Sequence, residues 1–100
     1  MKETGSSARR ALRVLKILKG HTLTGLANKE IADALNDSAV NVSRAIEVLM
    51  DEGLVAKLDN GRFAHSVAML QIAQAHVRHS DAIQNRLTEI NCRIAAGAMD

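Results

Sequence analysis

Three consecutive turn-forming residues, Asn36-Asp37-Ser38, lie between two stretches that have helical periodicity. After them, apolar residues recur at i, i+3, i+4 and i+7, the spacing of one buried helix face, as Val42, Ala45, Ile46 and Leu49. Before them, residues 29–35 form a short helical candidate. Because Asn, Asp and Ser favour turns and helix caps, we expect one helix to stop here and the next to start at Ser38. Two helices joined by so short a turn must cross at a steep angle, as in a helix-turn-helix.

Two helices are expected before this turn. The first is capped by Ser7 and runs to about Lys19, with an apolar face formed by Ala11, Val14, Leu15 and Leu18. Its other side is basic, which fits either a solvated face or a surface along a phosphate backbone. Residues 20–27, with two glycines and two threonines, are expected to form a loop. Asn28 should cap the second helix, whose buried residues are predicted to be Ile31, Ala34 and Leu35.

A hairpin is predicted after the third helix, for which Gly53 is a natural end. Leu54–Leu58 and Arg62–His65 are short extended candidates joined through Asp59-Asn60-Gly61. Asn60-Gly61 favours a hairpin turn in which both residues take positive φ. A lone hairpin is marginally stable, so this one must pack on the helices. The order of helix, helix, turn, helix and hairpin predicts a mainly α, winged helix-turn-helix fold over residues 7–65, after a disordered lead-in at residues 1–6.

The remaining residues, 66–100, are predicted to form a helical linker or dimerisation segment, with no Pro or Gly between Ser66 and Gly97. His79-Ser80-Asp81 favours a break into two helices, and one continuous helix is the alternative. A small winged domain has little core left to cover a further apolar stripe at coiled-coil spacing. The same helix of a second copy is its simplest cover. The predicted dimerisation residues are Ile83, Leu87, Ile90 and Ile94.

Composition and motifs exclude several classes of function. The chain has 100 residues, a net charge of +2, one aromatic residue and a single cysteine, Cys92, which fits a reducing cytoplasm. No apolar run approaches the roughly 18–20 residues of a membrane span. No phosphate-binding glycine loop or nucleophile–base arrangement is present, so neither enzymatic activity nor a cofactor is expected. His76 and His79 have a spacing that can bind metal, but without a third local ligand no metal site is predicted.

The start of the third helix carries side chains suited to base edges. Arginine at position 44 suits guanine, asparagine at position 41 suits adenine, and serine at position 43 can reach a base or a phosphate. Arginine 62 lies beside the hairpin turn, where a cation can enter a minor groove or touch phosphate. The alternative for each is an ordinary exposed side chain. The predicted DNA-binding residues are Ser38, Val40, Asn41, Ser43, Arg44, Lys29, Arg62 and Arg9.

Roughly residues 7–77 resemble the N-terminal DNA-binding domain of IclR-type regulators. The motifs that carry the resemblance are Ala8–Leu18, Lys29–Leu35, Asn41–Leu49, Glu52–Val55 and Gly61–Phe63. They are specific as a set and weak one at a time, because MarR- and ArsR-type winged domains share much of the pattern. The segment that follows is similar to the family's linker helix, which helps to hold a dimer. Family members normally continue into a larger ligand-binding domain, whereas this chain ends where that domain would begin. Small-molecule sensing is therefore not carried over from the resemblance, and no effector is predicted. The family's recognition helix usually starts with proline, whereas Ser38-Ala39-Val40 stands here and implies a different operator preference.

These patterns predict a sequence-specific, double-stranded DNA-binding transcriptional regulator that acts as a homodimer. Its expected location is the cytoplasm of a bacterial cell, as a bacterial or phage-encoded protein that regulates by occupying its operator. The alternative is a protein-interaction module on a winged-helix scaffold, such as an antirepressor or recruitment factor. The modest charge and the apolar Ala39-Val40 keep that alternative open.

Overall fold

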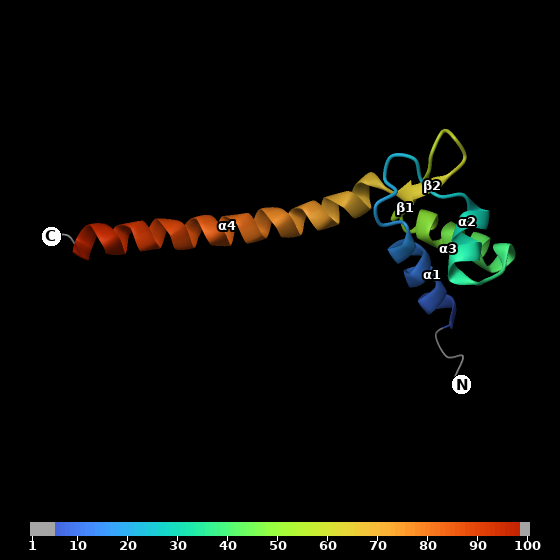
Figure 1. Cartoon of the computed structure of the whole chain (residues 1–100), viewed down its shortest axis with the longest axis horizontal. Coiled ribbons are helices and arrows are strands. Elements are labelled where there is room, and N and C mark those ends of the chain that lie inside the picture. Colours follow the sequence, from blue (N-terminus) through green and yellow to red (C-terminus); the bar gives the residue numbers. More distant parts are fainter. Residues whose placement is uncertain (1–5, 99–100) are drawn as a thin grey trace. The chain divides into compact units, whose positions relative to one another are not determined.

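The computed structural model describes residues 6–98, which form four helices and two strands (Figure 1). In chain order these are α1 (Ser6–Ile17), α2 (Asn28–Leu35), α3 (Ala39–Asp51), β1 (Val55–Lys57), β2 (Phe63–His65) and α4 (Val67–Ala98). The order confirms the predicted winged helix-turn-helix class. The predicted disordered lead-in lies outside the described residues, except for Ser6, which is the first residue of α1. The chain divides into a winged unit, residues 1–70, and a second unit, residues 71–100.

The core of the winged unit lies where α1, α2 and α3 meet the hairpin. The buried face of α3 is the predicted one, and Val14, Leu18 and Ile31 are fully buried against it. The prediction for α2 was wrong at Ala34, which is exposed, while Ala32 is buried. Residues 31, 32 and 35 fall within about 100° around a helix, and residue 34 falls outside that arc. Ala32 therefore takes the place in the core that the prediction gave to Ala34.

Helix starts depend on capping groups that the sequence identified only in part. The Ser38 cap of α3 is confirmed, since its Oγ accepts a hydrogen bond from the Asn41 N–H at 3.1 Å. The Asn28 cap was wrong, because α2 begins at that residue and Ala27 is its N-cap. The Glu30 carboxylate accepts a hydrogen bond from the Ala27 N–H at 2.8 Å, and this side chain therefore caps the start of α2. Ser7 likewise lies inside α1, which ends at Ile17 and not at Lys19.

The hairpin has the predicted three-residue connection, but its turn differs from the prediction in the conformation of Asn60. β1 and β2 pair antiparallel with Val55 opposite His65, and a three-residue loop joins Leu58 to Arg62. Within it the Gly61 N–H donates to the Leu58 carbonyl at 2.9 Å, and Gly61 alone takes a positive φ, of 84°. Asn60 does not take a positive φ, and its side chain accepts the Arg62 N–H and donates to the Thr24 carbonyl. The turn is thus a three-residue hairpin loop with a bulge at Gly61.

The loop before α2 is tied to the hairpin, which the sequence did not indicate. Leu26 and Phe63 exchange two backbone hydrogen bonds of 2.9 Å as an isolated antiparallel bridge. Gly25, with φ of 71°, makes this approach possible, since a Cβ there would lie 2.7 Å from the Phe63 carbonyl oxygen. The hairpin therefore has a third backbone partner and does not stand on two strands alone.

The predicted break at His79-Ser80-Asp81 was wrong, and α4 is one continuous helix of 32 residues, as the alternative held (Figure 1). Ser80 and Asp81 are exposed, so their side chains are solvated and need not cap a new helix. Every residue from Gln71 to Gly97 is exposed, including the apolar stripe. Within residues 6–98, no helix combines the length and apolar character needed to cross a membrane.

Candidate nucleic-acid interface

The outward face of α3 is the centre of the candidate interface. Because Val42, Ala45, Ile46 and Leu49 fill the core, the opposite side of the helix is left to solvent. That side presents Val40, which is 60% exposed, together with Ser43 and Arg44. Among residues 6–98 no carboxylate lies within ion-pair distance of the Arg44 guanidinium. The structure therefore places three of the predicted DNA-binding residues, Val40, Ser43 and Arg44, on one solvent-exposed side of α3. Arg44 is a cation without a carboxylate partner among the described residues.

Asn41 differs from these three because it is half-buried and engaged in the turn. Its Nδ2 donates to Asp37 Oδ1 at 3.0 Å, and the Ser38 N–H donates to the same oxygen at 2.7 Å. Arg10 Nε donates to the other carboxylate oxygen, Asp37 Oδ2, at 2.5 Å. This carboxylate therefore connects the start of α1 to the start of α3. Sequence reasoning missed the connection, since its partners are 27 residues apart and neither belongs to a local motif.

The hydrogen bond from the Arg10 side chain, followed by those from Asn41 and the Ser38 backbone, lowers the pKa of Asp37 from 3.8 to about 2. A carboxyl whose folded pKa is depressed stabilises the fold above its unfolded pKa and loses that contribution as pH falls through the folded value. The contribution of Asp37 should therefore be complete above about pH 4 and disappear toward pH 2.

Asp37→Asn should accordingly lower the free energy of unfolding at pH 6, with the deficit relative to wild type shrinking between pH 4 and pH 2. Urea unfolding followed by circular dichroism across that range measures the difference. Asp33→Asn is the matched control, because Asp33 makes only an exposed pair with Lys29, at 3.3 Å. A deficit that stays constant across this pH range would contradict the role given to the Asp37 charge.

Ser43 is oriented by the residue that was predicted to cap α2. Asn28 Nδ2 donates to Ser43 Oγ at 2.6 Å, so the hydroxyl proton of Ser43 can be directed outward. This contact crosses from α2 to α3 and fixes one side chain of the outward face relative to the helix-turn-helix. Asn28 is thus a positioning residue for the interface and not a helix cap.

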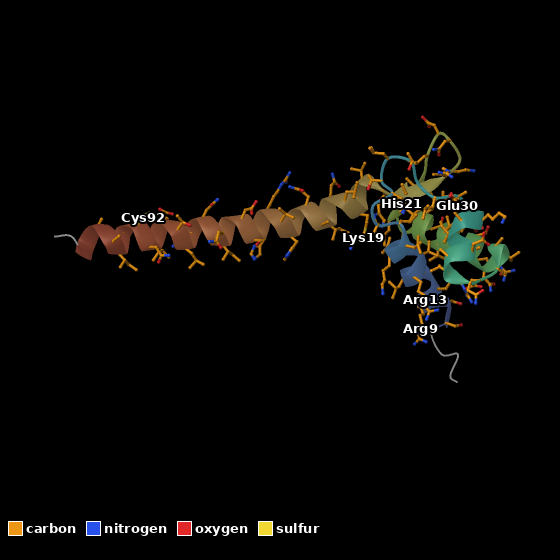
Figure 2. All side chains as sticks on the ribbon, in the orientation of Figure 1. Arg9, Arg13, Lys19, His21, Glu30 and Cys92 are labelled. Carbon is orange, nitrogen blue, oxygen red and sulfur yellow. The ribbon has the colours of Figure 1, made fainter. Side chains whose placement is uncertain are left out.

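The predicted phosphate contacts lie on other elements of the winged unit. Arg62 Nη2 is paired with Glu30 Oε1 at 2.8 Å, and Lys29 is paired with Asp33. Arg9 is exposed on α1, where Figure 2 shows it with Arg13. Exposed ion pairs contribute about 0–1 kcal/mol each, so exchanging the two carboxylates for phosphate costs little.

A surface hollow of about 340 Å³ lies between α1 and α3. Its polar lining is Ser7, Arg10, Asn41 and Arg44, and the rest of the lining is three alanines and Val48. Two arginines from different helices therefore reach one hollow at the edge of the outward face. Arg10 is neutralised there by Asp37, so Arg44 is the cation in this hollow that remains available to an anion such as a backbone phosphate.

The residues considered for metal binding do not meet. His76, His79 and Cys92 are exposed along α4. Over the described part of the chain, no three His, Cys, Asp or Glu side chains are grouped in a way that could hold a metal ion.

A family model described as the IclR helix-turn-helix domain matches residues 7–59, more than half of the chain. The matched segment runs from α1 into the hairpin loop and includes every predicted DNA-binding residue except Arg62. No curated protein matches the chain significantly.

Proposed function

This chain belongs to the IclR helix-turn-helix domain family and is a DNA-binding transcription regulator, and we propose that it occupies a specific two-fold operator as a homodimer. Occupancy of the operator would itself regulate, as in a repressor. The observation that carries the proposal is the outward face of α3, where Val40, Ser43 and Arg44 stand over a fully apolar back.

In the proposed complex α3 enters the major groove. Arg44 donates to guanine O6 and N7, Ser43 donates to a base or phosphate, and Val40 packs on a thymine methyl. Asn41 contributes differently from the sequence-based expectation, since reaching adenine requires it to leave Asp37. Its main effect is to hold the start of α3 against the turn.

Residues around α3 are proposed to fix its register on the duplex through the backbone. Arg9, Lys29 and Arg62 lie on α1, at the start of α2 and beside the wing turn, and all can exchange solvent or an exposed carboxylate for phosphate. Ser38 lies at the α3 N-terminus, where backbone N–H groups favour an anion. These contacts supply affinity and salt dependence, while the outward face supplies sequence preference.

Homodimerisation is proposed to use the exposed stripe of α4. Ile83, Leu87, Ile90 and Ile94 are between 39% and 64% exposed, an apolar strip that a second copy would cover. A two-fold dimer predicts a two-fold operator with half-site centres about 34–36 Å apart.

Arg44→Ala should weaken operator binding by about 1–3 kcal/mol and relax preference at one base pair, because a bidentate guanine contact is lost. Sites selected from random duplex DNA supply the operator, and fluorescence anisotropy at several salt concentrations measures the affinity. Arg44→Lys should also lose base preference, because lysine keeps the charge but not the fork of donors.

Arg78→Ala, on the exposed surface of α4, is the matched control because it removes the same charge outside the winged unit. Equal operator binding by Arg44→Ala and wild type would show that α3 does not read DNA through this side chain.

A protein-interaction module is the second candidate, and exposed apolar side chains on α1 and α3 favour it. Leu12 on α1 and Val40 and Val48 on α3 are between 54% and 60% exposed. Such a module would bind a partner through these side chains and would not need DNA. Absence of DNA binding even at low salt would favour it, whereas affinity that falls with rising salt supports the regulator.

A further inference from the structure

A fourth side chain, Glu47, belongs to the outward face of α3. Val40, Arg44 and Glu47 follow one another at i, i+4 and i+7, so they form one line along the helix. Leu49, which is buried, lies about 200° around the helix from Glu47, so this acid is directed away from the core. Glu47 is exposed. It therefore stands on the same surface as the proposed base contacts.

The Glu47 carboxylate is not used in an ion pair of the fold. None of the ion pairs among residues 6–98 includes it. Glu47 and Lys57 both line a surface hollow of about 280 Å³ between α3 and the hairpin, yet they lie beyond ion-pair distance of each other. Arg44, three residues earlier on the same face, does not pair with it either. The carboxylate therefore keeps its acceptor oxygens for a donor outside the chain.

We propose that Glu47 is a specificity-determining residue that accepts a hydrogen bond from the N4 amino group of a cytosine in the major groove. The inference rests on the proposed entry of α3 into that groove and adds a base contact to it. Cytosine presents an amino donor at its major-groove edge, guanine and thymine present acceptors, and adenine presents an acceptor beside its donor. A carboxylate only accepts, so the cytosine edge satisfies it and the acceptors of the other three bases repel it.

The spacing of Arg44 and Glu47 places their contacts on neighbouring base pairs. Three residues of helix rise about 4.5 Å, which is close to the separation of about 3.4 Å between successive base pairs. Side chains three residues apart contact successive bases in the same way in zinc-finger recognition helices. The operator should therefore carry a cytosine one base step from the guanine that Arg44 contacts.

The negative charge of Glu47 also opposes binding to incorrect sites. Where no cytosine amino group faces it, the carboxylate leaves water without gaining a hydrogen bond and lies close to the phosphates of the duplex. At the correct site the cytosine donor offsets this cost. Glu47 therefore acts mainly on the difference in affinity between correct and incorrect sequences, and contributes little to the total affinity.

The test compares the sites that wild type and Glu47→Gln select from random duplex DNA. Glutamine has the length of glutamate but carries one acceptor and an amide donor, which together match the N6 and N7 edge of adenine. Wild type should select cytosine next to the position whose base preference Arg44→Ala removes, and Glu47→Gln should select adenine there. On defined duplexes, replacing this cytosine by adenine should weaken wild-type binding by about 5–150-fold, the range for one mismatched base pair, and should strengthen binding by Glu47→Gln.

Asp51→Asn is the matched control, because Asp51 is an exposed acid one turn further along the same face of α3. Each variant removes one negative charge and leaves the core unchanged, so each should raise affinity for all sequences to a similar small extent. Only Glu47→Gln should change the preferred base.

Two results would overturn the assignment of Glu47. One is an unchanged base preference in Glu47→Gln, and the other is a gain in affinity that is uniform over sequences and equal to that of Asp51→Asn. If Arg44-dependent site selection persisted in either case, the proposed function would stand without the cytosine contact. Failure of wild type to select any site would instead overturn the proposed function and this contact with it.

Discussion

Leu87→Asp should abolish self-association and weaken binding to the two-fold operator by about 10²–10⁴-fold, because joined DNA-binding units engage the second half-site intramolecularly. Leu87 is in the middle of the α4 stripe and 50% exposed. A carboxylate there would be buried without a partner in the associated state and fully solvated in the free chain. Sedimentation equilibrium should therefore give the mass of a single chain, and the affinity for the two-fold operator should fall in the same variant. Its affinity for a single half-site should change little.

Asn85→Asp is the matched control for this prediction. It introduces the same acid two residues away at an exposed position outside the stripe. Its mass and operator affinity should stay near those of wild type. Undiminished operator binding by Leu87→Asp would mean that the stripe does not hold the DNA-binding units together.

Leu18→Ala should lower the free energy of unfolding of the winged unit by about 2–5 kcal/mol, through lost burial and the cavity left in the core. Leu18 has no exposed surface and packs with Val14 and Ile31 although it lies just past the end of α1. This is a large share of the roughly 5–15 kcal/mol by which small domains are stable. Chemical unfolding followed by circular dichroism measures the loss.

Leu23→Ala makes the same chemical change at a loop position that is 92% exposed. It should shift stability by no more than about 0.5 kcal/mol. Similar losses for the two leucine variants would contradict the core assignment, since the comparison removes identical atoms from buried and exposed sites.

Elements with strong local periodicity were predictable from the sequence. The 3.6-residue spacing of Val42, Ala45, Ile46 and Leu49 determined which face of α3 is buried, and that face determines which side chains remain outside. The Ser38 cap was predictable because its hydrogen bond joins residues only three apart. The exposure of Ser43 and Arg44 followed from the same periodicity, so the amino-acid sequence alone was sufficient to predict the centre of the candidate site.

The missed features depend on partners distant in sequence or on competition between two local preferences. Arg10 and Asp37 meet only because α1 packs on the helix-turn-helix, so no window of sequence contains the pair. Asn28 is a good cap in isolation, but Glu30 satisfies the helix start and leaves Asn28 to contact Ser43. Ser80 and Asp81 favour helix starts, yet a run without proline or glycine allowed α4 to continue through them.

The Glu30–Arg62 pair has a consequence for how the chain would search DNA. One carboxylate oxygen, Glu30 Oε1, accepts both the Ala27 N–H and Arg62 Nη2, each at 2.8 Å. Release of Arg62 therefore leaves the start of α2 capped. While the pair is closed, the wing arginine is neutralised and withheld from random phosphate, and each phosphate contact contributes about 0.9 to the logarithmic salt slope of binding. Glu30→Gln should thus strengthen nonspecific DNA binding modestly and steepen its salt dependence, which fluorescence anisotropy on random duplex DNA at several salt concentrations measures.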